Sequence, residues 1–137
     1  MQRLVVGAAA LALAVTTLAG CAEEPTSAGG GDAENATVAF LMPDLASTRY
    51  EEYDAPLFEA KMGELCPDCD VIYQNADSDA ALQQQQANSA ITQGASVIVL
   101  DPVDSAAAAT IVQSAQSQNV QVIAYDRPIP DRPADFY

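Results

Sequence analysis

The stretch QGASVIVLDPVDSAAAATIVQSAQSQNVQVIAYDR (residues 93–127) predicts a strand, a helix and a second strand in succession. The runs 96–100 and 120–125 have the continuous Val and Ile content of strands that are buried on both faces. Between them, Asp104 is expected to cap a helix that Asn119 closes. The apolar residues of this helix at 3.6-residue spacing are Ala108, Ile111, Val112 and Ala115. A strand–helix–strand unit of this length predicts a parallel pair with a right-handed crossover.

The same alternation extends toward the N-terminus. Residues 70–74 predict a strand, and a helix that starts at Asp77-Ser78-Asp79 is expected to end before Gly94. Residues 37–42 predict the first strand, and Asp54 is expected to cap the helix that follows it. The apolar residues at helical spacing are Leu57, Phe58, Met62 and Leu65 in the first helix, and Leu82, Ala87, Ala90 and Ile91 in the second. The order βαβαβαβ predicts an α/β domain, a three-layer Rossmann-like parallel sheet with helices on both faces.

The N-terminal part of the chain has the composition of a targeting segment. Residues 1–20 combine a basic start, an apolar run and small residues, as a secretory signal peptide does. They end in Leu18-Ala19-Gly20 before Cys21, which resembles the lipobox of bacterial lipoproteins, so we expect cleavage before Cys21 and lipidation of that residue. Residues 21–36 lack apolar periodicity and predict a flexible linker. The folded domain is therefore expected to span residues 37–137.

Composition excludes several classes of function. The net charge of −14 argues against nucleic acid as a partner, because nucleic-acid binding needs a basic face. The chain has no histidine, which removes the commonest general base and metal ligand. No Gly-rich phosphate loop follows the first strand, so a dinucleotide site is not expected. We therefore predict a binding protein with no catalytic residues, no metal and no cofactor.

Cys66 and Cys69 form a Cys-Pro-Asp-Cys motif with three possible states. A structural disulfide fits an exported protein, because disulfides persist outside the cytoplasm. A reduced, inert pair is the second possibility. A redox-active pair would make the chain a small α/β enzyme, but its first cysteine would need to lie at a helix N-terminus, and the motif follows a predicted helix. A zinc site would need two more Cys or His ligands, which the sequence does not supply.

Polar residues follow the predicted strands, and in an open α/β sheet ligands bind beyond the carboxyl ends of the strands. We call this edge, with its loops, the rim. Its candidate residues are Asp44, Ser47, Thr48, Arg49, Tyr50 and Tyr53 after the first strand, Asn75 and Asp77 after the second, Asp101 and Asp104 after the third, and Asp126 and Arg127 after the fourth. Tyr50 or Tyr53 would supply the aromatic ring on which the apolar face of a sugar packs. Aspartates accept hydrogen bonds and arginines donate them. Such a mixed rim favours a neutral polyol over a charged ligand.

Several of these residues have a structural alternative. Asp77 and Asp104 are expected to act as helix caps, and Asp101 with the proline after it is expected to shape a turn. Asp126 and Arg127 have the alternative of a surface ion pair, which contributes little to stability. Arg49 has the alternative of an exposed residue at a helix start.

From Thr37 onward the chain resembles the pentose/hexose group of periplasmic sugar-binding proteins, and within it the D-xylose-binding subgroup. The resemblance lies in VAFLMP (38–43), STRYE (47–51), YQNAD (73–77), QGASVIVLDP (93–102) and VQVIAYDR (120–127). It implies the N-terminal lobe of a type I periplasmic binding protein. It also implies that Asp126 and Arg127 hydrogen-bond a sugar, that Arg49 contacts it, and that the ring of Tyr50 stacks on it.

The resemblance further implies an extracytoplasmic, lipid-anchored receptor that delivers a monosaccharide to the permease of an ABC importer. A sensing partner of a chemoreceptor or sensor kinase is the alternative within the same class. The sequence departs from the family at Tyr50, where xylose-type proteins usually have Trp, and at Tyr137, where the family continues into a second lobe. We therefore expect a fragment, and weak binding, because the lobe that would enclose the sugar is missing.

Overall fold

The computed structural model describes residues 35–137. The predicted signal peptide, the lipidation site at Cys21 and almost all of the linker lie outside the described residues. The elements are β1 (Thr37–Met42), the π-helical turn η2 (Tyr50–Asp54), α1 (Ala55–Leu65), β2 (Asp70–Asn75), α2 (Ala80–Thr92), β3 (Ala95–Leu100), α3 (Ala109–Ser117) and β4 (Gln121–Ala124). Within this part of the chain, no helix has the length and apolar character needed to cross a bilayer.

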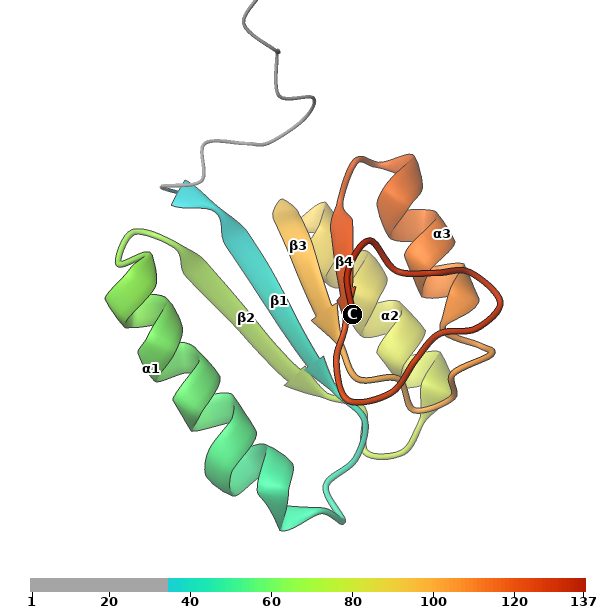
Figure 1. Cartoon of the computed structure of the whole chain (residues 1–137), viewed down its shortest axis with the longest axis horizontal. Coiled ribbons are helices and arrows are strands. Elements are labelled where there is room, and N and C mark those ends of the chain that lie inside the picture. The colour runs from blue at the N-terminus through green and yellow to red at the C-terminus, as the bar shows by residue number, and fades with distance from the viewer. Residues whose placement is uncertain (1–34) are drawn as a thin grey trace, which may run out of the picture.

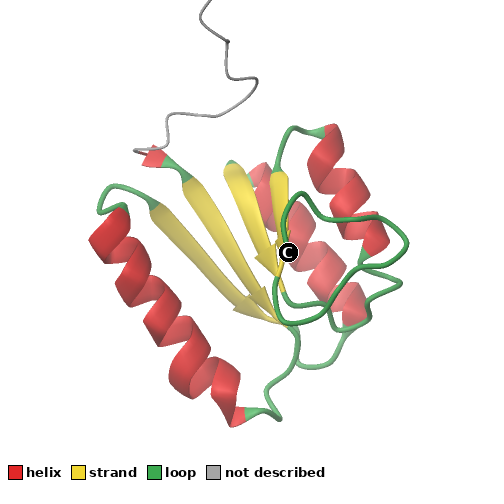
Figure 2. Ribbon diagram, viewed as in Figure 1, coloured by secondary structure: helices red, strands yellow, loops and turns green. Residues whose placement is uncertain are grey.

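The four strands form one parallel sheet in the order β2-β1-β3-β4. All the strand arrows point to the same edge of the sheet (Figure 2). Helix α1 covers one face, and α2 and α3 cover the other (Figure 1). The predicted fold class, a three-layer α/β sheet with helices on both faces, is confirmed. At the outer edge of β4, Phe136 adds an isolated parallel bridge to Ile123.

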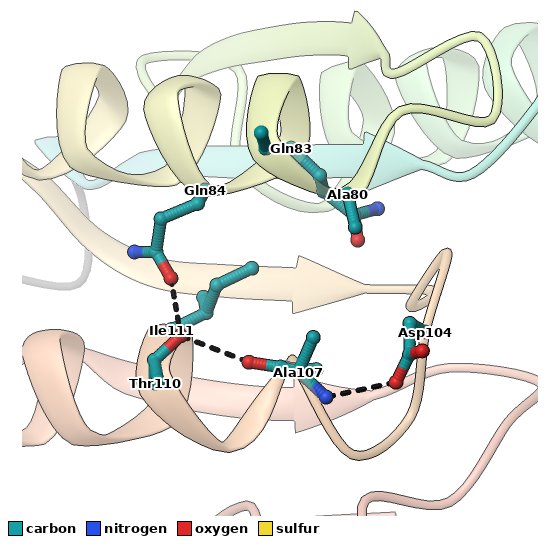
Figure 3. A pocket seen from close by; sticks show the side chains of 9 residues that line it. Ala80, Gln83, Gln84, Asp104, Ala107, Thr110 and Ile111 are labelled. Carbon is teal, nitrogen blue, oxygen red and sulfur yellow. Dashed lines mark hydrogen bonds between the residues drawn. The ribbon is translucent and has the colours of Figure 1, made fainter.

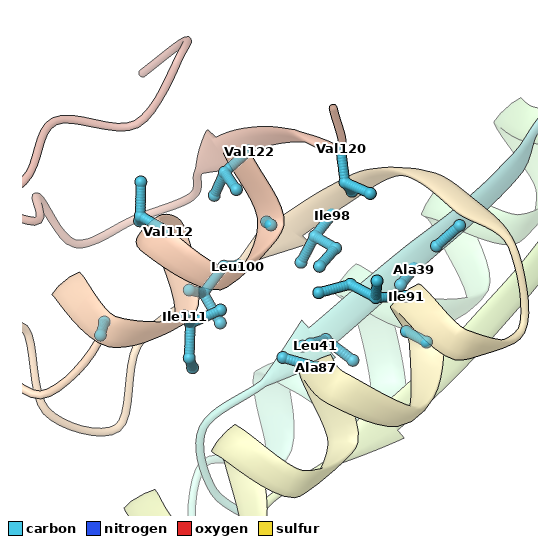
Figure 4. Close-up of a cluster of buried hydrophobic side chains, with 14 of the residues drawn as sticks. Ala39, Leu41, Ala87, Ile91, Ile98, Leu100, Ile111, Val112, Val120 and Val122 are labelled. Atoms are coloured by element: carbon cyan, nitrogen blue, oxygen red, sulfur yellow. The ribbon is translucent and has the colours of Figure 1, made fainter. Parts of the chain in front are cut away.

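Strand β1 is central because its side chains are apolar on both sides of the sheet. Ala39 and Leu41 point toward α2 and α3, and the alternate residues point toward α1. The larger core packs β1 and β3 against Ala87 and Ile91 of α2 and against Ile111 of α3 (Figure 4). All four predicted inner residues of the third helix are buried. These layers hold the carboxyl ends of the strands at one edge.

The face toward α1 is built around aromatic side chains. The ring of Phe40 on β1 stacks on Phe58 of α1 with a centroid separation of 4.3 Å. Tyr125, just after β4, meets the edge of Phe40 at 5.6 Å. The other buried residues of this cluster are Val38, Met42, Tyr50 and Val99. Tyr50 is thus anchored in the core on this face.

The first helix differs from the prediction in two respects. Leu57 and Leu65 were expected on its inner face and are exposed, whereas Phe58 and Met62 pack against the core as expected. Asp54 does not cap the helix, because the backbone is already helical from η2 onward and the carboxylate binds Arg49 instead. Helical spacing alone did not reveal which side of α1 faces the sheet.

The second helix is capped by Asp79, whose Oδ1 accepts hydrogen bonds from the backbone N–H groups of Ala81 and Leu82. The prediction that Asp77 is a cap was therefore wrong. Asp77 has a φ of 47° and lies in the turn before the helix. Gly94 has a φ of +92°, the left-handed conformation expected after a helix C-terminus.

Cys66 and Cys69 form a disulfide with their Cα atoms 5.3 Å apart. The loop follows the C-terminus of α1, where the N–H of Cys66 donates to the carbonyl of Met62. It precedes β2 and so lies at the edge of the sheet opposite the rim. A helix C-terminus does not lower a thiol pKa, so this position offers no activation of a redox cysteine.

Candidate functional site

Backbone hydrogen bonds continue past the ends of the strands and hold the rim in place. The N–H of Asp101 donates to the carbonyl of Leu41 at 3.0 Å, and the N–H of Tyr125 donates to the carbonyl of Leu100 at 2.8 Å. Asp126 then takes a left-handed φ of 61°, which turns the chain away from the sheet. An aspartate tolerates this conformation better than most residues do. The loops after β1, β3 and β4 are thereby brought together.

Arg49 and Asp126 meet directly, although they lie 77 residues apart in the sequence, on the loops after β1 and β4. Nη2 of Arg49 is 3.1 Å from Oδ2 of Asp126, and its Nε donates to Oδ2 of Asp54 at 2.9 Å. The hydrogen bond to Asp126 raises the pKa of Arg49, and the charge of Asp54 adds to this effect. The guanidinium therefore remains protonated. The expected convergence of Arg49 and Asp126 at one rim is observed.

Arg127 lies beside this pair and is held by the segments that follow β1 and β3. Its Nη1 donates to the carbonyl of Pro102 at 2.8 Å, and its Nη2 donates to the hydroxyl of Tyr50 at 3.2 Å. It also forms ion pairs with Asp101 at 3.5 Å and with Asp44 at 3.8 Å. A guanidinium has five N–H groups in a fixed plane, so these partners fix its orientation and leave donors available to a ligand.

Tyr50 is placed differently from the ring that the resemblance implied. The residue is 3% exposed, and the guanidinium of Arg49 lies 4.9 Å from the centroid of its ring. Burial raises the pKa of Tyr50 to about 12, so its hydroxyl stays protonated and accepts from Arg127. Stacking on a sugar would require Arg49 to move off the ring. The observed contacts are those of a residue that supports both arginines.

Asp101 is the residue of the rim whose environment the sequence did not reveal. Its side chain is fully buried, and within residues 35–137 neither carboxylate oxygen has a partner in hydrogen-bonding geometry. Burial raises the pKa of Asp101 to about 6, although the nearby Tyr50 hydroxyl and the charge of Arg127 act in the opposite direction. The sequence-based prediction that Asp101 shapes a turn describes its backbone and not its side chain. A Pro directly after an Asp in such a loop gives no signal of burial.

The other rim candidates have structural partners. Oδ1 of Asp44 accepts from the N–H of Ser47 at 2.8 Å, which shapes the loop after β1. Asn75 donates to the carbonyl of Asp44 and to Glu51, each at 2.9 Å. Asp104 caps the turn that leads into α3 by accepting from the N–H groups of Ala106 and Ala107. The latter role agrees with the cap predicted from the sequence.

A pocket of about 220 Å³ lies between the N-terminal parts of α2 and α3 (Figure 3). Four of its nine lining residues are alanines, and its one carboxylate, Asp104, is already engaged as a cap. Thr110 and Gln84 bond to each other across it. The lining has no set of converging charged groups of the kind that orients a polar ligand. The candidate site is therefore the rim around Arg49 and Arg127 rather than this pocket.

Comparison with known proteins gives a consistent result. The family model described as "periplasmic binding protein domain" matches residues 38–137 of the sequence. The D-xylose-binding periplasmic protein of Escherichia coli (strain K12) is 29% identical over 105 residues, which cover 77% of this chain and 31% of that protein.

Solved structures show the same likeness. An ABC transporter solute binding protein from Clostridium phytofermentans with bound β-D-glucose has a TM-score of 0.65 and 26% identity, covering 72% of this chain and 29% of the other. A carbohydrate transporter solute binding protein from Chloroflexus aurantiacus in complex with D-glucose has a TM-score of 0.61 and 25% identity, covering 67% of this chain and 26% of the other. The chain thus spans 26–31% of the length of these three relatives.

Proposed function

The chain belongs to the periplasmic binding protein domain family, and on this premise we propose that it binds a neutral monosaccharide outside the cytoplasm. The family predicted from the sequence motifs is thereby confirmed, and membership implies an extracytoplasmic location. The relatives named above are binding proteins of transport systems rather than enzymes. We assign Arg49, Asp126 and Arg127 to the proposed sugar site, and Tyr50 to it as the residue that supports both arginines.

The observation that carries this proposal is the pairing of Arg49 with Asp126 at 3.1 Å, next to Arg127. The three side chains remain 45%, 39% and 37% exposed, so a ligand can reach them. Arginine N–H groups and a carboxylate at one place match the hydroxyl groups of a sugar, which accept and donate at once. An anion would be repelled there by Asp126, and a cation would be repelled by Arg49 and Arg127. The D-xylose-binding relative makes D-xylose the first sugar to test.

We further propose that the chain is a lipoprotein that serves an ABC importer. The lipobox-like residues before Cys21 favour lipidation, and Cys21 would then anchor a domain of residues 37–137 through the linker 21–36. The same lobe would suit a sensor partner equally well. Permease and ATPase genes beside this one would favour import, and a histidine-kinase or chemoreceptor gene in their place would favour sensing.

Titration of the ¹⁵N-labelled chain with D-xylose, followed by ¹H–¹⁵N correlation spectra, tests the sugar proposal. This method detects dissociation constants in the millimolar range, equivalent to about −4 kcal/mol. Shifts should be confined to the loops that carry Arg49, Tyr50, Asp126 and Arg127. L-glutamate, a charged control of similar size, should shift none of them. Equal shifts with both compounds, or no shifts at the rim, would contradict the proposal.

A further inference from the structure

The guanidinium of Arg127 contacts the turn of residues 101–103, and the buried side chain of Gln83 hydrogen-bonds this turn. We propose that Gln83 and Asp101 are positioning residues that orient Arg127 toward a ligand. The inference rests on the proposed function, because it takes Arg127 as a sugar-binding residue. Neither residue needs to touch the sugar, since Gln83 is 1% exposed and Asp101 is fully buried.

Gln83 hydrogen-bonds the turn through both the nitrogen and the oxygen of its side-chain amide. Its Nε2 donates to the carbonyl of Asp101 at 2.8 Å, and its Oε1 accepts from the N–H of Val103 at 2.9 Å. An amide is the side chain that can donate and accept in this way without adding charge to a buried position. Because α2 is packed into the core through Ala87, Ala90 and Ile91, these two bonds tie the turn to a rigid element.

The turn then presents two acceptors to the guanidinium of Arg127. The carbonyl of Pro102 lies 2.8 Å from Nη1, and Oδ1 of Asp101 lies 3.5 Å from Nε. A planar guanidinium that contacts fixed acceptors through two different nitrogens has little freedom to rotate. The third nitrogen, Nη2, contacts the hydroxyl of Tyr50. The plane of Arg127 is therefore set by contacts that lie behind the rim.

The buried carboxylate of Asp101 contributes its charge. Arg127 forms an ion pair with this carboxylate, and Asp44 forms a second ion pair with the same arginine. The other titratable groups that act on Asp101 are Tyr50, Asp126 and Arg49. A buried ion without full hydrogen bonding is unfavourable for folding. Proteins accept such a penalty mainly where function requires it. This favours a role for Asp101 in the site over a role in stability.

The test observes the Nε–Hε group of Arg127 by NMR, in the full chain and without any sugar. The signal is assigned by its loss in Arg127→Lys. In the wild-type chain it should shift with pH, with a midpoint near the pKa of Asp101 of about 6. Asp101→Asn should abolish this titration. Asp104→Asn, the same change at an exposed carboxylate of the same loop, should leave it intact.

Gln83 is tested by two substitutions of different chemistry. Gln83→Leu removes both bonds to the turn, and Gln83→Glu keeps the acceptor but loses the donor. Both should broaden the Nε–Hε signal of Arg127 and weaken D-xylose binding about tenfold, as expected when a hydrogen-bonding group loses its support. Gln85→Leu, on the exposed side of the same helix, should do neither. Circular dichroism verifies folding, and if Gln83→Leu unfolds, Gln83→Glu and the Asp101 titration decide.

The outcomes separate the two proposals. An Arg127 signal that does not respond to pH or to any substitution at Gln83 and Asp101 would overturn the positioning role. A responding signal with unchanged D-xylose affinity in these variants would overturn it as well. If the signal responds but the wild-type chain does not bind D-xylose, Gln83 and Asp101 do orient Arg127, and it is the proposed sugar-binding function that fails.

Discussion

Single residues of the rim have competing structural and functional demands. Asp101 begins a turn and its N–H extends the sheet ladder to Leu41, yet its carboxylate is enclosed beside Arg127. The first two properties are stabilising. The third is unfavourable for the folded state, because a charge is removed from water without full compensation. The two demands can be separated by measuring stability against pH.

Asp101→Asn is expected to stabilise the chain at neutral pH. The pKa of Asp101 rises from 3.8 to about 6 on folding, so the folded state binds the proton more tightly and loses stability as pH increases between these values. The neutral amide avoids this loss, which amounts to roughly 1–3 kcal/mol. Urea unfolding followed by circular dichroism over a pH series measures the difference, which should vanish below about pH 4. A variant less stable than wild type at neutral pH contradicts this reasoning.

Two substitutions of Asp126 are expected to separate the effect of its charge from the effect of its backbone conformation. Asp126→Asn keeps a residue that tolerates the observed φ of 61°, whereas Asp126→Ala adds a strain of about 1 kcal/mol. Both variants lose the ion pair with Arg49, and both should weaken D-xylose binding by about 1–3 kcal/mol, because a donor is left unpaired. NMR titration measures the affinity and urea unfolding the stability. Unchanged affinity in both variants would remove Asp126 from the site.

At the scale of elements, the π-helical turn η2 decides how the loop after β1 meets the rest of the rim. It places Tyr50 in the core and Arg49 at the rim, before α1 begins at Ala55. An extra residue per turn changes the direction of side chains relative to an α-helix, and such turns are frequent at functional sites. Nothing in the sequence YEEYD itself explains why this turn is π-helical.

Substitution of two glycines by alanine is expected to change stability in opposite directions. Gly94 has a φ of +92° after α2, and Gly63 lies inside α1, and no neighbouring atom lies within 4 Å of an added Cβ at either position. Gly94→Ala should therefore destabilise the chain by about 1 kcal/mol through backbone strain alone. Gly63→Ala should stabilise it by about 0.5–1 kcal/mol through helix propensity. Urea unfolding of both variants measures this, and equal effects of one sign would contradict the assigned conformations.

At the scale of the whole molecule, the layers explain why charged residues gather at one edge. Both faces of the sheet are occupied by apolar cores, so polar side chains lie in the loops at the strand ends. Two of the five basic residues of the chain, Arg49 and Arg127, lie at the carboxyl edge. Against a net charge of −14, these two arginines make the rim distinct from its surroundings.

Attachment of the molecule to a membrane is expected to depend on one residue. Radiolabelled palmitate should be incorporated into the wild-type chain expressed in a bacterium, and Cys21→Ala should abolish the label, because the thiol is the proposed acylation site. Cys66→Ala combined with Cys69→Ala is the control that should retain it, since those thiols are joined in a disulfide. Label that persists in Cys21→Ala would rule out lipidation at this position.

The sequence alone determined the order of strands and helices, the parallel sheet and the meeting of Arg49 with Asp126. Apolar runs and 3.6-residue spacing are local signals, and the handedness of strand crossovers then leaves few topologies. It also determined which loops share an edge, because parallel strands end together. These properties follow from interactions between residues that are near in sequence or from general rules of chain geometry.

Only the tertiary structure decided which side of α1 faces the sheet, that Tyr50 is buried beneath Arg49, and that Asp101 is enclosed. It also revealed Gln83, which in the sequence is one of several neighbouring glutamines of α2. Burial and hydrogen-bond partners depend on groups brought together from distant parts of the chain, such as Gln83 and Val103 or Tyr50 and Arg127. No local pattern carries that information, because the energy of a buried polar group is set by the neighbours that folding places around it.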